Sequence, residues 1–355
     1  MILDFKKLVK FDIKKFSSYK SARSLCVKGN IWLNANESPI SYEFSTVNKH
    51  LNRYPDSQSK DILYKYSKYS NIDYNNILIS RGIDESIELL IKTFCNPFVD
   101  KIIYFYPTYD MYKITAEIFG VESIKIFLKN DSLKKYEKIK NNINYIKLIY
   151  ICRPNNPTGC LMSKKELINI LEITFGKALV IVDEAYIEFC ILESVVPLIK
   201  KYSNLVVLRT LSKAFGLAGI RCGFTLANSE IIKILNKVIS PYPIPSITYE
   251  IANFALNKSF LNFMEKTVLK LNKNKNWLLK ELKKISYVKK IFKSFANYIL
   301  VEFYDSSFIF KNMNKKGIIL RDQSYKKGLK NCIRISVGNK IECKKLIYEL
   351  KKKIL

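Results

Sequence analysis

The 355-residue sequence contains one histidine, His50, and no long apolar segment. A metal site built on imidazole ligands is therefore not expected, and we predict no bound metal. No apolar run approaches the roughly 18–20 residues that cross a bilayer, so no membrane partner is expected. Residues 1–7 lack an apolar core and a small-residue cleavage site, which does not predict a secretory signal.

The eight cysteines contain no C-x-x-C pair, and several lie inside apolar, strand-like runs. This pattern excludes a disulfide framework or a cysteine zinc site, and it favours buried free thiols in a reducing compartment. We therefore expect a cytoplasmic protein.

Acidic residues are scarce, 31 against 60 basic ones, which gives a net charge of +29. Such a charge is typical of nucleic-acid or membrane binding. The lysines are dispersed, however, and Lys, Ile, Asn and Tyr, whose codons are AT-rich, crowd the sequence. Dispersed lysines usually form solvated faces, so we expect no nucleic-acid partner. An anionic substrate benefits from the field as a secondary effect.

Apolar residues make up 48% of the chain, with 23 Tyr and 21 Phe, which excludes a disordered chain. The length predicts one large domain and a smaller one. Because there is no internal repeat and no Gly/Ser/Pro-rich linker, we expect the domains to be packed against each other.

From about residue 75 to 230, short β-branched runs alternate with helical patterns. The predicted strands are 77–80, 102–106, 147–152, 179–183, 205–209 and 222–226, and the clearest helices are 85–94, 111–119 and 164–175. This alternation predicts an α/β fold with a mostly parallel sheet flanked by helices on both faces.

The pattern changes at about residue 253. A long helix through Trp277 leads to predicted strands 298–303, 318–321 and 333–337 and a terminal helix from Glu342. These elements predict a smaller α+β domain. We place the large domain at 51–255 and the small domain at 256–355. The segment 1–50, with a strand at 32–34, should pack on the small domain.

Ligands of such sheets bind outside the carboxyl ends of the strands. Four groups of residues follow predicted strands there, namely Arg81-Gly82, Tyr109, Asn155-Asn156 and Ser212-Lys213, and Asp183 ends its own strand. Their convergence on one edge predicts a binding site.

Lys213 lies in a run rich in small residues, 209–223, which permits close approach of the backbone to a ligand. An arbitrary lysine in so basic a chain is a solvated surface group, but this one shares the sheet edge with Asp183. A carboxylate at the end of a buried strand needs a cation, either in a structural ion pair or on a protonated pyridine nitrogen. Protonation of such a ring makes it an electron sink.

Two loops extend this interpretation. Residues 153–159 form a turn by composition, and Asn156 and Tyr186 could each reach the phenolic oxygen of such a ring. Residues 80–85 join a strand to a helix, whose first backbone N–H groups would bind a phosphate, with Ser212 and Arg221 completing the cradle.

These residues resemble the fold-type I, pyridoxal-phosphate-dependent aminotransferases, and within them the histidinol-phosphate aminotransferase family. The likeness covers nearly the whole chain. The segments that carry it are 19–23, 32–37, 51–55, 155–159, 182–189 and 319–322. It implies a seven-stranded sheet, the cofactor pyridoxal 5'-phosphate and a homodimer with shared active sites.

The resemblance also implies roles around the cofactor ring. Lys213 would form the Schiff base, and Asp183 would pair with the pyridine nitrogen. Tyr186 and Asn156 would contact the phenolic oxygen, and Tyr109 would stack on the ring.

For the cofactor phosphate, the resemblance implies the amides at Ile83 and Asp84, with Ser212 and Arg221. A Tyr54 from the second subunit would complete that site.

For the substrate, the resemblance implies Arg334 at the carboxylate and Tyr19 and Arg321 at the substrate's own phosphate, with Asn156 as a further substrate-binding residue. Two residues depart from the family pattern. Arg153 stands where a small residue is usual, and Asp110 where Gly is usual.

The implied reaction interconverts L-histidinol phosphate plus 2-oxoglutarate with imidazole-acetol phosphate plus L-glutamate, in histidine biosynthesis. Two half-reactions at one site imply ping-pong kinetics. An aromatic-amino-acid aminotransferase or a phospho-amino-acid decarboxylase of the same fold remains an alternative, because the lysine run does not separate them. A non-catalytic nucleic-acid-binding protein is a remote alternative that rests on the charge alone.

Overall fold

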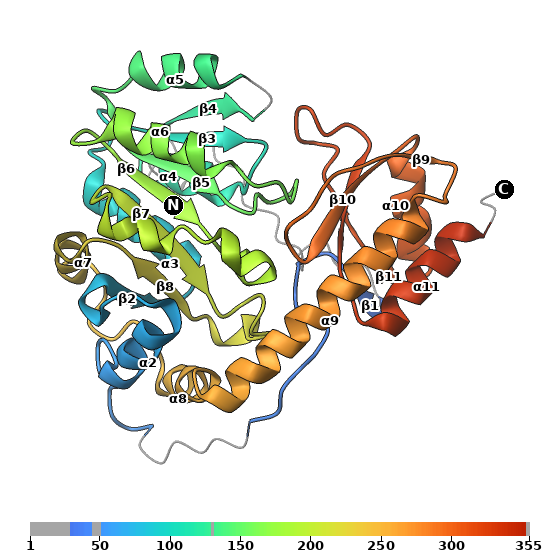
Figure 1. Ribbon diagram of the computed structural model, residues 1–355, viewed down its shortest axis with the longest axis horizontal. Helices are drawn as coiled ribbons and strands as arrows, with labels where there is room; N and C mark the ends of the chain where they lie inside the picture. The colour runs from blue at the N-terminus through green and yellow to red at the C-terminus, as the bar shows by residue number, and fades with distance from the viewer. Residues whose placement is uncertain (1–28, 45–50, 129–130, 353–355) are drawn as a thin grey trace, which may run out of the picture.

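Seven strands form one mixed sheet at the centre of the large domain (Figure 1). The computed structural model describes residues 29–44, 51–128 and 131–352. Along the sheet the strands are β2 (Ile77–Ser80), β8 (Gly223–Leu226), β7 (Leu205–Thr210), β6 (Leu179–Asp183), β5 (Ile146–Cys152), β3 (Lys101–Tyr106) and β4 (Glu122–Phe127). Only β8 runs antiparallel to its neighbours, so the sheet is mostly parallel, as predicted.

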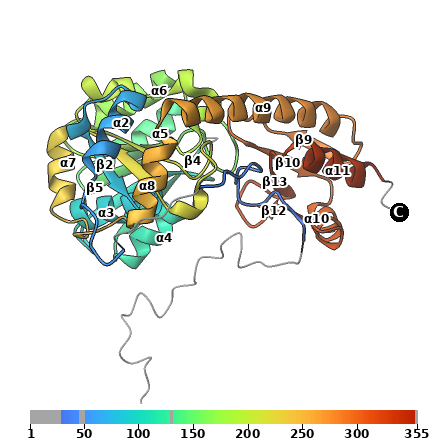
Figure 2. The same cartoon turned by 90° about the horizontal axis from the view of Figure 1, so that it is seen from below.

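The central strands are continuous apolar runs because helices cover both faces of the sheet. Val180, Val182 and Val207 are fully buried, as expected for strands without a solvated face. Helices α3 and α4 lie on one face and α6 on the other (Figure 2). The helices of this domain are α2 (Lys60–Ser70), α3 (Ile83–Phe94), α4 (Met111–Ile118), α5 (Ser132–Lys140), α6 (Lys164–Thr174), α7 (Ser229–Asn236) and α8 (Ser246–Ala255). Short 3-10 helices are η2 (Tyr74–Asn76), η3 (Ile187–Glu193), η4 (Val196–Lys200) and η5 (Ala218–Ile220).

The six strands predicted for this region are present, with ends shifted by at most one residue. The edge strand β4 was not among them, because most of its side chains are partly exposed and its apolar pattern is weak. Helix α3 begins at Ile83 rather than Glu85, since Gly82 at its N-cap adopts a φ of +86°.

The long helix α9 (Lys258–Leu282) leads from the large domain to the small one (Figures 1 and 2). The small domain contains an antiparallel sheet in the order β12 (Arg321–Asp322), β13 (Cys332–Ser336), β10 (Tyr298–Phe303) and β9 (Val288–Ile291). Helices α10 (Ser306–Lys315) and α11 (Lys340–Lys351) complete it. The terminal helix begins two residues before the predicted Glu342, because Asn339 caps it in a capping box with Glu342.

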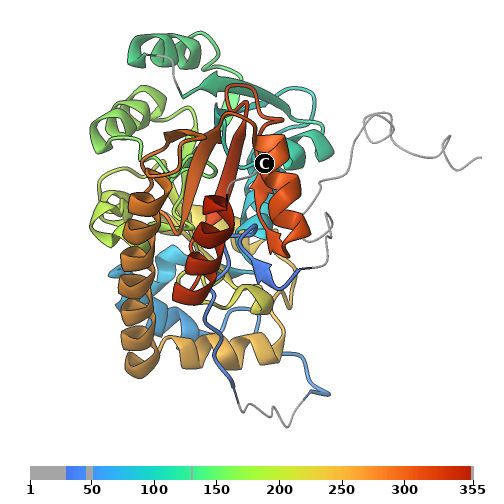
Figure 3. The same ribbon diagram turned by 90° about the vertical axis from the view of Figure 1, so that its right-hand side faces the viewer.

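Strand β1 (Ile31–Trp32) pairs in parallel with β11 (Ile318–Ile319), which places residues 31–32 beside the small domain (Figure 3). The strand predicted at 318–321 is wrong as one element, because Leu320 separates β11 from β12, which belong to different sheets. The limits 1–50, 51–255 and 256–355 stay a prediction. Among the described residues, no helix combines the length and apolarity that a membrane crossing requires.

Candidate active site

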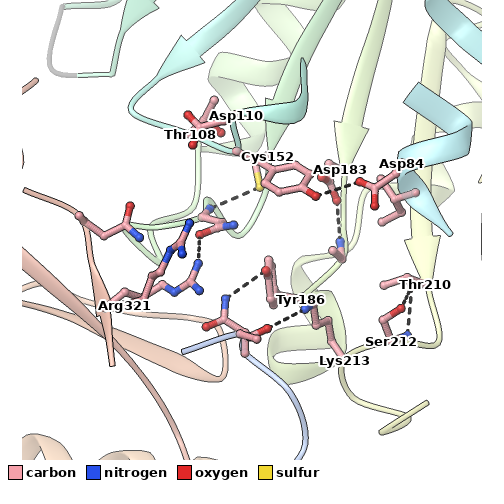
Figure 4. A pocket seen from close by; sticks show the side chains of 18 of the residues that line it. Asp84, Thr108, Asp110, Cys152, Asp183, Tyr186, Thr210, Ser212, Lys213 and Arg321 are labelled. Atoms are coloured by element: carbon pink, nitrogen blue, oxygen red, sulfur yellow. Dashed lines mark hydrogen bonds between the residues drawn. The ribbon is translucent and has the colours of Figure 1, made fainter. Parts of the chain in front are cut away.

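A cavity of about 350 Å³ lies at the carboxyl ends of the central strands and is lined by residues of both domains (Figure 4). Most of the residues predicted for the site line it, namely Ile83, Asp84, Tyr109, Asn156, Asp183, Tyr186, Ser212, Lys213, Arg221, Arg321 and Arg334. The topology explains the convergence, because β2, β7, β6, β5 and β3 point the same way.

Lys213 follows β7 and directs its amine into the cavity. Its Nζ donates a hydrogen bond to the Ala35 carbonyl oxygen at 3.0 Å. Burial, followed by the charge of Arg334, lowers the pKa of Lys213 to about 8. A lowered pKa leaves a larger share of the amine neutral near pH 7, which is the form that attacks a carbonyl.

Asp183 ends β6 and is only 3% exposed. Its Oδ2 accepts a hydrogen bond from the Tyr112 hydroxyl at 2.5 Å, and its Oδ1 accepts one from the Ala185 amide at 3.0 Å. Burial raises the pKa of Asp183 to about 6, while the two hydrogen bonds and the charge of Lys213 oppose that shift. The carboxylate is therefore poised for a cationic partner in the cavity.

Arg334, on β13, joins the small domain to the site. Its Nη1 donates to the Asn156 side-chain oxygen at 2.5 Å, and its Nη2 donates to the Asn34 carbonyl at 2.6 Å. Beside it, the Tyr186 hydroxyl accepts a hydrogen bond from Asn36 Nδ2 at 3.1 Å. Burial raises the pKa of Tyr186, so its hydroxyl keeps its proton.

The turn between β2 and α3 is built on glycine. Gly82 has a φ of +86°, and a Cβ at Gly223 would lie 2.8 Å from the Gly82 backbone. Because both residues lack side chains, the antiparallel strand β8 can approach the start of α3 closely. Nearby, Asp84 pairs with Arg221 at 3.3 Å and accepts a hydrogen bond from the Tyr109 hydroxyl at 2.9 Å.

Ser212 and Thr210 line the same side of the cavity as Asp84, with Arg321 opposite in this view (Figure 4). The Ser212 amide donates to Thr210 Oγ1 at 3.1 Å, and that hydroxyl donates to Ser212 Oγ at 2.9 Å. Ile83, Asp84 and Arg221 line the cavity as well, so the residues predicted for a phosphate site share it, and their binding role stays a prediction.

A buried ion network lies next to the strand ends that bear Asp183 and Lys213. Arg209 Nε contacts Glu184 at 2.8 Å, and its Nη1 contacts Glu188 at 3.0 Å. All three side chains are almost fully buried. The network ties the end of β7 to the segment after β6, and so fixes the spacing of the two central groups.

Two residues predicted for the site are not among those that line the cavity. Tyr54 is 80% exposed and stacks on Tyr242 with ring centroids 4.4 Å apart. Because Tyr54 does not line the cavity of its own chain, this exposed position is compatible with a role in a second subunit. Tyr19 lies outside the described residues.

Sequence reasoning missed several residues of the site. Tyr112 lies on α4 and donates to Asp183, 71 positions away, and no local pattern in the sequence marks this contact. Asn36 stands in a segment that carried the resemblance, but no role was assigned to it. Lys326 also lines the cavity, and nothing distinguished it among the other basic residues.

Comparison with known proteins agrees with this geometry. The family described as aminotransferase class I and II matches residues 30–350. A curated histidinol-phosphate aminotransferase of Buchnera aphidicola subsp. Schizaphis graminum is 54% identical over 352 residues, covering 99% of each chain.

The chain belongs to the class I and II aminotransferases, and within them to the histidinol-phosphate aminotransferases.

Solved structures agree with the fold of this aminotransferase. The histidinol-phosphate aminotransferase from Clostridium acetobutylicum has a TM-score of 0.82 at 28% identity, and the match covers 91% of this chain and 98% of that one. The enzyme of the same name from Sinorhizobium meliloti, solved in complex with pyridoxal 5'-phosphate, has a TM-score of 0.82 at 19% identity over 96% of each chain. At that identity the second likeness shows the fold alone.

Pyridoxal 5'-phosphate is the cofactor of this family, and the residues of the cavity fit it. An amine of lowered pKa and a buried carboxylate face the same cavity. The close approach of Gly82 and Gly223 leaves the first amides of α3 open beside the Arg221 guanidinium, as a phosphate group requires. A cavity of about 350 Å³ is within the usual range for small-molecule sites.

Proposed function

We propose that this aminotransferase interconverts L-histidinol phosphate plus 2-oxoglutarate with imidazole-acetol phosphate plus L-glutamate, in histidine biosynthesis. The observation that carries the proposal is that Lys213 and Asp183 line one cavity, whose small-domain side presents Arg321 and Arg334. The name of the 54% identical relative supports the substrate assignment. A cytoplasmic location stays a prediction.

Pyridoxal phosphate, when bound, withdraws electrons from the substrate carbon that carries the amino group and so makes its proton acidic. We assign the movement of that proton to the Lys213 amine, whose lowered pKa suits a general base that must later act as an acid. Asp183 would hold positive charge on the pyridine nitrogen, because a buried carboxylate gains most from a cationic partner. Tyr186 and Asn156 would hold the phenolic oxygen of the ring, and Tyr109 would pack against the ring.

The cofactor phosphate is assigned to the amides at Ile83 and Asp84, with Ser212 and Arg221. The Asp84 carboxylate would repel a phosphate. Its ion pair with Arg221 partly neutralises that charge, and the hydrogen bond from the Tyr109 hydroxyl holds the carboxylate in place.

The substrate anions are assigned to two arginines. Arg334 binds the glutamate carboxylate together with Asn156, because a guanidinium grips a carboxylate with two parallel bonds. Arg321, which is 8% exposed, binds the phosphate of histidinol phosphate. We keep Tyr19 as a second phosphate ligand by resemblance alone.

We further propose a homodimer in which Tyr54 completes the phosphate site of the partner. Tyr54, Tyr242 and Leu51 are large apolar side chains with 80%, 52% and 65% exposure. Exposed groups of this kind are typical of an interaction surface, and a twofold axis would repeat each contact.

The deciding experiment is an amino-acceptor panel with glutamate as donor and the purified holoenzyme. Imidazole-acetol phosphate should be the preferred acceptor over phenylpyruvate and over the unphosphorylated imidazole-acetol. Preference for phenylpyruvate would replace the proposal with an aromatic aminotransferase. Carbon dioxide release from phospho-amino acids without amino transfer would replace it with a decarboxylase. No transfer to any acceptor would remove the catalytic proposal.

A further inference from the structure

Asp110 and Lys326 meet across the two domains at the cavity. Asp110 is the N-cap residue of α4 in the large domain, and Lys326 lies in the turn between β12 and β13 of the small domain. The Lys326 ammonium donates to the Asp110 carboxylate and to the Thr108 carbonyl, the latter at 2.9 Å. The Tyr325 hydroxyl donates to the second oxygen of Asp110 at 3.3 Å.

The turn that carries Lys326 is compact and has a second anchor on the large domain. The Lys326 amide donates to the Gln323 carbonyl at 3.0 Å, and the Leu329 amide donates to the Lys326 carbonyl at 2.9 Å. The Lys327 amide donates to the Tyr106 hydroxyl at 2.7 Å. These bonds hold the turn from Gln323 to Leu329 together. Arg321, a cavity residue, precedes the turn, and Gln323, another cavity residue, begins it.

Electrostatics explain why Lys326 needs Asp110. The Lys326 side chain is only 4% exposed, and burial together with the charges of Arg334 and Arg321 lowers its pKa. A buried cation beside two guanidinium groups is costly unless an anion compensates it. The Asp110 carboxylate supplies that compensation and opposes the shift in pKa. The contact with Asp110 thus compensates the charge of Lys326.

We propose that Asp110 and Lys326 form an interdomain clasp that positions Arg321 for the anionic substrate. The clasp holds the turn from Gln323 to Leu329 against the start of α4, and thereby holds the arginine that precedes the turn over the cavity. Asp110 and Lys326 are positioning residues in this proposal, since they touch no reacting atom. The effect on substrate binding rests on the proposed function, in which Arg321 binds the phosphate of histidinol phosphate.

The test compares holoenzymes carrying Asp110→Asn, Lys326→Met and both changes. Lys327→Met is the matched control, because it removes the same charge from the next, exposed residue and keeps the backbone bond to Tyr106. Asp110→Asn is isosteric at a side chain that is 34% exposed, so it should fold even if Lys326→Met does not.

Each single change should raise KM for histidinol phosphate about tenfold with kcat nearly constant, and the double change should be no worse than either single one, as coupled partners behave. Hydrogen exchange of residues 320–329 should accelerate in both single variants and stay at the wild-type rate in Lys327→Met. The exchange measurement reports the clasp independently of turnover.

Two results would overturn the clasp. One is a lower KM in Asp110→Asn with a higher KM in Lys326→Met, which would make Lys326 a direct phosphate ligand that Asp110 restrains. The other is wild-type exchange in both single variants. If the wild-type enzyme itself does not use histidinol phosphate, the proposed function fails, and the exchange rates alone decide the clasp.

Discussion

At the residue scale, burial shifts the pKa values of Lys213 and Asp183 in opposite directions, and both shifts favour the binding of one ligand. It lowers the pKa of the amine to about 8 and raises the pKa of the carboxyl to about 6. Both shifts favour the neutral form of the isolated group, because a low-dielectric site disfavours charge. A ligand that brings a carbonyl to the amine and a positive charge to the carboxylate relieves both costs.

The lowered pKa of Lys213 predicts how fast the apoprotein captures its cofactor. The amine is protonated below about pH 8 and neutral above it. The rate of covalent capture should therefore rise with pH up to about 8 and then level off, well below the ordinary lysine value of about 10.4. Stopped-flow absorbance after mixing apoprotein with pyridoxal phosphate measures this rate. Lys213→Ala should show no capture, and a rate that keeps rising toward pH 10 would contradict the prediction.

Tyr112 gives a second prediction at this scale, because its hydroxyl donates a hydrogen bond to the Asp183 carboxylate, as the Ala185 amide does. Tyr112→Phe should raise the pKa of Asp183 further and weaken cofactor retention, since a hydrogen bond to a charged group contributes about 1.5–3 kcal/mol. The ring stack on Tyr150, at 4.8 Å, should preserve the fold. Equilibrium dialysis of the cofactor measures the loss.

Tyr150→Phe is the control for Tyr112. It removes an equally buried hydroxyl whose long bond, 3.4 Å, goes to the Ile87 carbonyl and not to Asp183. Equal cofactor affinity in the two variants would mean that the Tyr112 hydroxyl does not support Asp183.

At the scale of the elements, Arg153, which stands where the resemblance implies a small residue, has partners for its buried charge. This residue follows β5 and is 1% exposed. Its Nε donates to the Met162 carbonyl at 2.8 Å, and its guanidinium pairs with Glu193 at 2.9 Å and bonds the Glu193 carbonyl. Arg153 begins the loop that contains Asn156. It thus connects the start of this loop both to Met162 at the loop's end and to Glu193 in η3.

Replacement of Arg153 should therefore cost stability and leave the chemistry in place. Arg153→Met should lower the free energy of unfolding by about 2–4 kcal/mol, because one buried and one partly buried carbonyl lose a charged donor. Lys164→Met is the control, since Lys164 lies 3.9 Å from the same Glu193 carboxylate but is 45% exposed. It should cost about 0–1 kcal/mol. Urea unfolding measures both, and equal losses would show that Arg153 acts only as a surface charge.

At the scale of the whole molecule, the high positive charge does not gather at the cavity alone. Many lysines form exposed pairs, such as Lys113 with Glu117 and Lys233 with Glu230. Exposed pairs of this kind contribute little to stability. They therefore give no structural reason for the excess of basic over acidic residues. A non-catalytic nucleic-acid-binding protein would have no use for Lys213 and Asp183 in one cavity. Their common position therefore favours catalysis.

The proposed dimer predicts recovery of activity when two inactive chains are mixed. Subunits carrying Lys213→Ala are combined with subunits carrying Tyr54→Asp and allowed to exchange. A hybrid then contains one site with both residues intact and one with neither. Random exchange makes about half of the dimers hybrid, so about a quarter of wild-type activity should appear. Activity is measured before and after exchange, with hybrids verified by differential tags. Verified hybrids without added activity would place Tyr54 outside the partner's site.

The order of elements and the central chemistry were predictable from the sequence because both are local. Continuous apolar runs predicted β5, β6 and β7, and turn residues marked where they end. In a parallel sheet these ends share one edge, so Asp183 and Lys213 were expected to meet before any distance was known. The edge strand β4 was missed, because a half-exposed strand lacks a continuous apolar run.

The tertiary structure alone decided which groups support that chemistry. Tyr112 on Asp183, Asn34 on Arg334 and the pairing of Asp110 with Lys326 join residues between 71 and 300 positions apart. No periodicity carries such pairs, because their partners are chosen by the packing of two domains. Lys326 is one of many lysines in the sequence. It becomes a buried ion because the two domains pack against each other, and no local sequence pattern predicts that packing.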